Sequence, residues 1–296
     1  QIIFGVPLRL QRITVNIDRP GFMFNPTNCT QQQITATISG SQQATANLGS
    51  PFAVAGCKSL AFKPGFAVST SGRTSRLGGA SLDAKVSYPA GSVGSEANIA
   101  RVKVELPKIL PARLTTLQKA CTAAQFASNP AGCPPASVVG IVRATTPLLP
   151  VGLEGPAYFV SHGGEAFPSL VVVLQGDGVR VDLVGSTFIS KAGVTSSTFR
   201  TVPDVPVGTF ELYLPEGPYS ALAATGNLCA TTKTITVKHR LTRHIHGRTV
   251  QRTLKTRERR PATLQMPTEF VAQNGTVIHQ STAIKVTGCT NGRTHK

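Results

Sequence analysis

The sequence contains no tryptophan and only four tyrosines among its 296 residues. Sugar-binding sites commonly present such rings as flat amphipathic surfaces, so their scarcity argues against a lectin. No run of 18 or more apolar residues occurs, and we therefore predict no membrane-spanning helix. The cysteines include no C-x-x-C pair, the spacing typical of structural zinc sites, so we predict no bound metal.

Motifs of common hydrolases are also missing. Ser161-His162-Gly163-Gly164 is similar to the oxyanion loop of some esterases, but the nucleophile motif G-x-S-x-G occurs nowhere in the chain. The thirteen carboxylates are scattered, so neither a glycosidase pair nor an acidic calcium loop can be assigned. We predict a protein that is not an enzyme and uses no cofactor, and a hydrolase is the last of the alternatives.

Acidic residues are few relative to basic ones. Thirty lysines and arginines against thirteen aspartates and glutamates give a formal net charge of +17. A charge of this size favours acidic partners such as nucleic acid, anionic cell-wall polymers or anionic lipid. The hydrophobic content of 41% indicates that the chain nevertheless folds around a core.

Six cysteines are present, and a repeated pattern indicates how they pair. The pattern is a strand-like run, an asparagine shortly before a cysteine, and a second cysteine after Val-x-Gly; it occurs over residues 13–57 and again over residues 210–289. Equivalent bonds in the two copies leave two cysteines for each other. The predicted disulfides are Cys29–Cys57, Cys121–Cys133 and Cys229–Cys289. Such bonds persist in oxidising compartments, so we predict an extracellular or cell-surface protein.

The two copies differ in length and suggest a division of the chain. The first cysteine pair is separated by 28 positions and the second by 60, so the second copy carries 32 additional residues, at 233–264. We expect residues 1–63 to be the C-terminal part of a first β module whose upstream sequence and export signal have been removed. Residues 64–200 form a central β region, and residues 201–296 form the second copy with its insertion.

Short runs rich in Val, Ile, Thr and Phe, separated by Gly, Pro, Ser and Asn, predict a mainly β protein of tandem antiparallel, Ig-like sandwiches. Residues 170–174 and 179–184 flank Gly176-Asp177-Gly178, a strong hairpin signal. The first of these runs has no polar face, so we expect a strand covered on both sides. Only residues 113–127 show helical spacing, and we predict one short helix there.

The insertion 233–264 contains ten of the thirty basic residues, and its alternation on both sides of His246-Gly247 predicts a protruding basic hairpin. Charged side chains there could protect a sheet edge from aggregation, or they could pair with a polyanion. A specific nucleic-acid site is disfavoured because the hairpin has no aromatic residue for stacking. His244 and His246 share a strand face, yet no third metal ligand is placed. The candidate polyanion contacts are Lys238, Arg240, Arg243, Arg248, Arg252 and Lys255.

Several segments resemble a known group of proteins. Arg113 to Cys121, Asn129 to Pro134, Gly155 to Gly164 and Phe210 to Cys229 are similar to segments of uncharacterised secreted, repeat-containing bacterial surface proteins. The resemblance covers most of residues 60–230. It implies an exported surface protein built of disulfide-stapled β modules, and it transfers no catalytic or binding residue.

Two functional hypotheses follow. The first is a non-enzymatic structural or adhesive surface component that forms filaments or packs against neighbouring copies, with strand addition near residues 1–10. The second is a binding module for acidic polymers or glycans that uses the basic hairpin.

Overall fold

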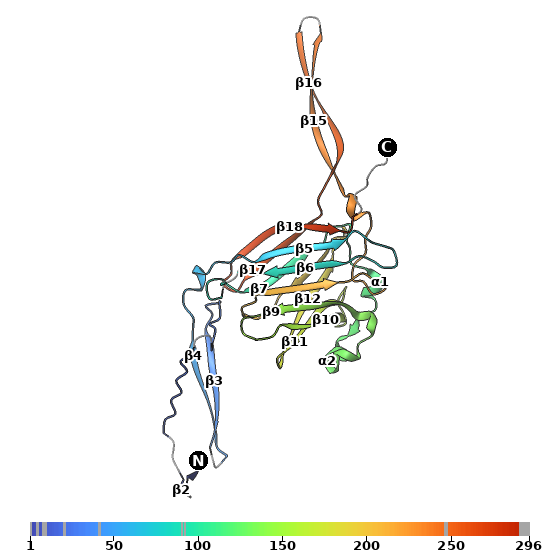
Figure 1. Cartoon of the computed structure of the whole chain (residues 1–296). Coiled ribbons are helices and arrows are strands. Elements are labelled where there is room, and N and C mark those ends of the chain that lie inside the picture. The colour runs from blue at the N-terminus through green and yellow to red at the C-terminus, as the bar shows by residue number, and fades with distance from the viewer. Residues whose placement is uncertain are drawn as a thin grey trace.

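The main body of the molecule is a closed sheet of eleven strands, seen in a computed structural model (Figure 1). The structure describes residues 2–3, 6–7, 11–19, 22–40, 43–89, 91, 93–245 and 248–289. The strands of the closed sheet are β5 (Gly65–Ser71), β6 (Leu82–Ser87), β7 (Ile99–Glu105), β9 (Val138–Thr145), β10 (Leu153–Ser161), β11 (Ser169–Gly176), β12 (Val179–Ile189), β13 (Thr195–Phe199), β14 (Thr209–Leu214), β17 (Gln265–Ala272) and β18 (Val277–Thr287).

The sheet closes because β10 pairs with β11 as well as with β9. The order around this barrel is β11-β12-β13-β7-β17-β18-β5-β6-β14-β9-β10. Neighbours in the barrel are antiparallel except β18 and β5, which pair in parallel from Ile284↔Val68 to Thr287↔Ser71. The mainly β prediction is therefore confirmed, but the tandem Ig-like sandwiches are not observed. Strands from the predicted central region and from the predicted second copy share one sheet.

The hairpin of β11 and β12 forms as the sequence predicts. Asp177 and Gly178 both have positive φ, at 51° and 74°, which is the backbone of a tight turn between twisted strands. Residues 170–174 are all buried. Leu170, Val172 and Leu174 face the barrel interior, while Val171 and Val173 pack outside it with Tyr158.

The single predicted helix is wrong in detail. The described part of the chain has two short helices, α1 (Leu114–Leu117) and α2 (Ala123–Ser128), separated by β8 (Cys121–Thr122). The chain is extended at β8 because it pairs with the end of β10. The Thr122 side chain then caps α2 by accepting a hydrogen bond from the Gln125 N–H, at 3.3 Å. Three-residue 3₁₀ turns occur at Cys57–Ser59, Pro130–Gly132, Pro135–Ser137 and Leu228–Ala230.

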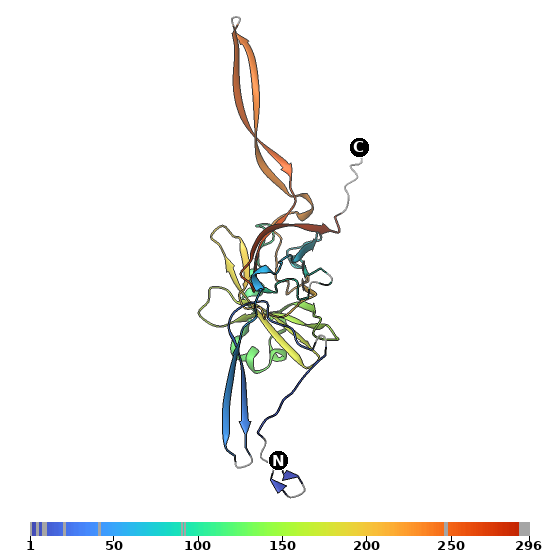
Figure 2. The same ribbon diagram turned by 90° about the vertical axis from the view of Figure 1, so that its left-hand side faces the viewer.

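Two hairpins project from the barrel in opposite directions (Figures 1 and 2). The ribbon consists of β15 (Thr232–Ile245) and β16 (Arg248–Pro261), which confirms the predicted basic hairpin; its His246-Gly247 turn lies outside the described residues. The arm, residues 11–57, contains the hairpin of β3 (Gln32–Ser39) and β4 (Thr45–Phe52). Strands β1 (Ile2–Ile3) and β2 (Val6–Pro7) pair near the N-terminus, and the rest of the predicted strand-addition segment 1–10 lies outside the described residues.

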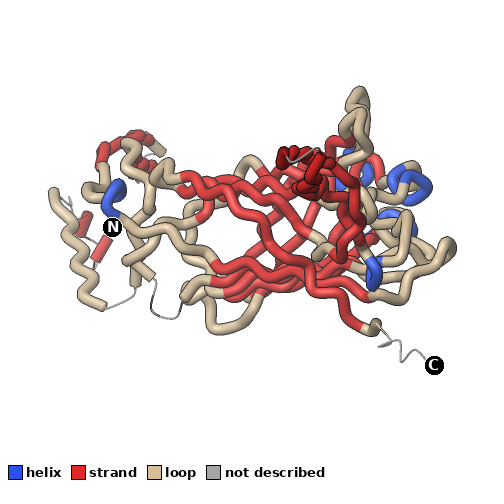
Figure 3. Tube along the Cα trace, turned by 90° about the horizontal axis from the view of Figure 1, so that it is seen from above, coloured by secondary structure: helices blue, strands red, loops and turns tan. Residues whose placement is uncertain are grey.

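All three predicted disulfides are present, Cys29–Cys57, Cys121–Cys133 and Cys229–Cys289. They occur at the base of the arm, beside α2 and near the base of the ribbon. Figure 3 shows the barrel from above, with the arm and one helical turn at one end and the other helices toward the opposite end. The disulfides are compatible with the predicted oxidising compartment. None of the helices in the described ranges has the length and apolar character needed to cross a membrane.

Candidate functional site

Five of the ten lysines and arginines in the ribbon share one face. In an antiparallel pair, directly opposed residues share a face, and alternate residues along each strand share it too. The register therefore places five exposed cations on the same face: Lys238, Arg240, Lys255, Arg257 and Arg259. Lys238 stands directly opposite Lys255. Like charges in opposed positions are destabilising, and an anionic partner would remove the repulsion.

The only carboxylate of the ribbon lies on its other face. Glu258 pairs with Arg260 at 3.0 Å and with His239 at 3.4 Å. The hydrogen bond from Arg260 is the main reason that the pKa of Glu258 lies below its usual value. Among the described residues, no carboxylate forms an ion pair with any of the five cations on the first face. We call that surface the cationic face.

The predicted polyanion contacts are only partly placed by the structure. Lys238, Arg240 and Lys255 lie on the cationic face. Arg243, Arg248 and Arg252 belong to the distal half of the ribbon, and their side chains lie outside the described residues. Sequence reasoning missed Arg257 and Arg259. They follow Lys255 at successive intervals of two residues, and this alternation could have identified them because it puts all three on one side of a strand.

The arm hairpin is uncharged, in contrast to the basic ribbon. Residues 32–52 contain no charged side chain. One face is polar, whereas the other carries Ile34, which is 63% exposed, Leu48, which is 54% exposed, and Phe52, which is 40% exposed. The register brings them together, since Ile34 opposes Ser50, Ala36 opposes Leu48 and Gln32 opposes Phe52. We call this uncovered surface the apolar arm face. Contiguous exposed apolar patches of this kind commonly mark interaction sites.

Asp204 fixes the base of the arm to the barrel. Its carboxylate accepts two hydrogen bonds from Thr27, one from the backbone N–H and one from the hydroxyl, each at 2.7 Å. It accepts two more from Asn28, at 3.0 Å from the backbone N–H and at 2.7 Å from the side-chain amide. The side-chain amide of Asn98 donates a fifth, at 2.8 Å. Partial burial would raise the pKa of Asp204, but these hydrogen bonds outweigh it and hold the pKa below its usual range. Asn274 adds bonds from its amide to the carbonyls of Cys57 and Leu60.

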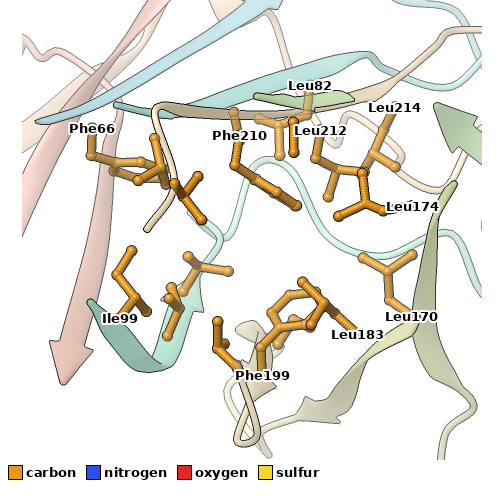
Figure 4. Close-up of a pocket in the computed structure, with 18 of the residues that line it drawn as sticks. Phe66, Leu82, Ile99, Leu170, Leu174, Leu183, Phe199, Phe210, Leu212 and Leu214 are labelled. Atoms are coloured by element: carbon orange, nitrogen blue, oxygen red, sulfur yellow. The ribbon is translucent and has the colours of Figure 1, made fainter. Parts of the chain in front are cut away.

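A cavity of about 220 Å³ occupies the barrel interior. Figure 4 shows Phe66, Phe210 and Leu214 on one side of an open band, with Ile99 and Phe199 on the other. Nearly every barrel strand contributes to the wall, which is almost wholly hydrocarbon and includes no charged side chain among the described residues. The cavity therefore offers an apolar surface to a molecule that enters it.

Neither a catalytic group nor a metal site emerges from the described residues. Among the described residues, the cavity wall has no carboxylate, histidine, lysine or arginine, and no group of three or more potential metal ligands gathers anywhere in the described ranges. His162 lies in an exposed turn where its backbone N–H donates to Glu165 at 2.8 Å, so the esterase-like run forms a loop. His246, half of the possible histidine pair, lies outside the described residues.

The chain matches no protein-family model, and comparison with curated proteins and with solved structures likewise finds no match.

Proposed function

We propose that this protein is a non-enzymatic structural and adhesive component of an extracellular surface, and that it self-associates through the apolar arm face. The observation that carries the proposal is the exposure of Ile34, Leu48 and Phe52 on one side of an uncharged hairpin. Burying these side chains would remove apolar surface from water, the main favourable contribution to most protein association.

A second copy of the same arm is the occupant that the charges favour. Each chain carries a formal charge of +17, so most approaches between copies are repulsive. Residues 32–52 form a long segment without charge, and the arm points away from the ribbon (Figure 1). Contact between two arms therefore keeps the ribbons far apart. Two identical faces that cover each other define a two-fold dimer, the commonest symmetric assembly.

The test is the concentration dependence of molar mass, measured by sedimentation on the full chain. We expect dimers at micromolar concentration, and monomers when Ile34→Asn and Leu48→Asn are combined. Thr35→Asn with Thr37→Asn is the matched control, because it places the same side chain on the polar face of the same strand pair. The proposal would be wrong if the wild type stayed monomeric, or if the control pair dissociated the dimer equally. Open-ended polymers would indicate head-to-tail contacts and would contradict the two-fold arrangement.

A second function is favoured by the pairing of Lys238 with Lys255. We infer that the cationic face binds an acidic polymer, because a polyanion would neutralise cations that pair with no carboxylate in the described part of the chain. A dimer joined by its arms presents two such faces, and simultaneous binding would raise the overall affinity without new contacts. The protein would then join acidic polymer chains together.

Retention by immobilised heparin and binding of inorganic polyphosphate test this second function. Replacing Lys238, Arg240 and Arg257 with glutamine should weaken affinity at least about tenfold and flatten its salt dependence. The matched control replaces Lys63, Lys108 and Lys285, three exposed lysines outside the ribbon. Equal weakening by both triple variants would show that only net charge matters.

A further inference from the structure

We propose that the barrel cavity binds a small, neutral, lipid-like molecule that carries one hydroxyl or carbonyl group. This site is independent of both external faces, because the residues that line it belong to the barrel strands and their connections (Figure 4).

Several hydroxyl groups line the cavity, and that of Ser197, on β13, is the one buried without a hydrogen-bond partner among the described residues. Buried polar groups are nearly always paired, and an orphan group calls for an explanation. A ligand oxygen reaching Ser197 would satisfy this hydroxyl.

The side chains of the cavity wall determine the charge and polarity of the rest of the ligand. Its phenylalanine, leucine and valine side chains offer water few of the two to four polar partners that an ordered molecule requires. None of the described residues that line the cavity is charged, so a carboxylate or ammonium group inside would have no counter-ion there. The ligand should therefore be uncharged, which favours an aliphatic alcohol, ketone or ester over a free fatty acid.

The size of the cavity limits the ligand to one chain. Its volume of about 220 Å³ exceeds the roughly 150 Å³ of an apolar cavity that admits benzene and falls short of the roughly 300 Å³ at which drug-sized pockets begin. Figure 4 shows lining side chains facing each other from opposite walls, so we choose an unbranched chain as the probe. Decan-1-ol is a suitable probe.

The chain offers a clean optical test because it has no tryptophan. Phe199→Trp places a sole indole in the cavity wall, and 10-bromodecan-1-ol should quench its fluorescence saturably. Unlabelled decan-1-ol should reverse the quenching. Linear, non-saturable quenching would overturn the site, and so would equal quenching of a tryptophan placed on the outer surface by Phe188→Trp.

The polar contact has its own control. Ser197→Ala should weaken decan-1-ol binding about fivefold while leaving decane binding unchanged, because only the alcohol uses the hydroxyl. Ser196 is the neighbouring residue, and it does not line the cavity. Ser196→Ala should therefore change neither decan-1-ol binding nor decane binding. Equal affinities of wild type and Ser197→Ala for the alcohol would refute the assigned contact. Ala144→Phe fills the cavity and should abolish binding of both probes; retained binding by this variant, if it folds, would place the ligand elsewhere.

Discussion

Gly72 illustrates how one missing side chain allows a disulfide to pack. A Cβ at this position would collide with Cys229 Sγ and lie 3.0 Å from Cys289 Sγ and 3.2 Å from the Thr287 carbonyl. We predict that Gly72→Ala lowers the free energy of unfolding by about 1–3 kcal/mol, because the backbone and the bond must shift. Urea unfolding provides the measurement. Gly132→Ala is the matched control, since its new methyl group meets nothing closer than 3.7 Å; equal destabilisation by both would contradict the explanation.

Asp204 should give the molecule a measurable pH dependence. Its pKa in the folded chain lies below the ordinary value of 3.8, so the folded state favours the ionised carboxylate. The resulting stabilisation is complete above the unfolded-state pKa and is lost as pH falls through the lowered folded-state pKa. We predict that Asp204→Asn destabilises the wild type at pH 6–7 and that this difference shrinks below about pH 4. Thermal unfolding between pH 3 and pH 7 measures it, and a difference that does not change with pH would refute the role of ionisation.

At the scale of elements, the cations of the ribbon affect both the stability of its strand pair and its binding of polyanions. Lys255→Glu would convert the repulsive pair with Lys238 into an attractive one, stabilising the ribbon by roughly 0.2–1 kcal/mol. The same change should weaken polyphosphate binding, because it removes one cation and adds an anion to the cationic face. Amide hydrogen exchange over residues 232–240 and a binding titration measure the two effects. Lys285→Glu makes the same charge change on β18 and should affect neither the exchange rates nor polyphosphate binding strongly. If Lys255→Glu slowed exchange without weakening binding, the cationic face would not be the contact surface.

Local patterns predicted the elements that depend on neighbouring residues. Alternation identified the ribbon, and the Asp177-Gly178 turn identified the hairpin of β11 and β12. The helix near residues 113–127 was predicted as continuous because its apolar spacing continues through Cys121. The structure interrupts it there because Cys121 pairs with Val160 on β10, a partner that local sequence does not reveal. The cationic face was partly predicted, since its full membership depends on the register of two strands.

At the scale of the whole molecule, closure of the barrel depends on contacts between distant segments. Strand β18 pairs with β5, and β17 pairs with β7, so the end of the chain seals a sheet begun some 200 residues earlier. A strand that alternates apolar and polar residues fits a sandwich and a barrel equally well, because both bury one face. The cavity could not be predicted either, because it depends on contacts between distant segments. Its size is set by the distance between side chains on opposite walls, and only the assembled sheet fixes that distance.

The ribbon is attached to the barrel as a separable element. Its base is closed by a hydrogen bond from the Ala262 N–H to the Thr231 carbonyl at 2.9 Å, so the chain leaves and re-enters the barrel at adjacent points. We predict that replacing Thr232–Pro261 with Asn-Gly, a turn suited to two opposed strands, leaves the barrel folded. The replacement shortens the segment closed by Cys229–Cys289 from 60 positions to 32, which changes the loop entropy by only about 0.6 kcal/mol.

The melting temperature should therefore stay within a few degrees of the wild type, and unfolding should remain cooperative. Circular dichroism and a thiol assay measure these outcomes, and heparin retention should fall in the same variant if the cationic face is the contact surface. A matched replacement within the barrel, exchanging residues 266–286 for the same Asn-Gly link, removes most of β17 and β18 and should abolish cooperative melting. If excision of the ribbon also produced free thiols or a broad transition, the ribbon would be part of the folding unit, because closure of the barrel would then require it.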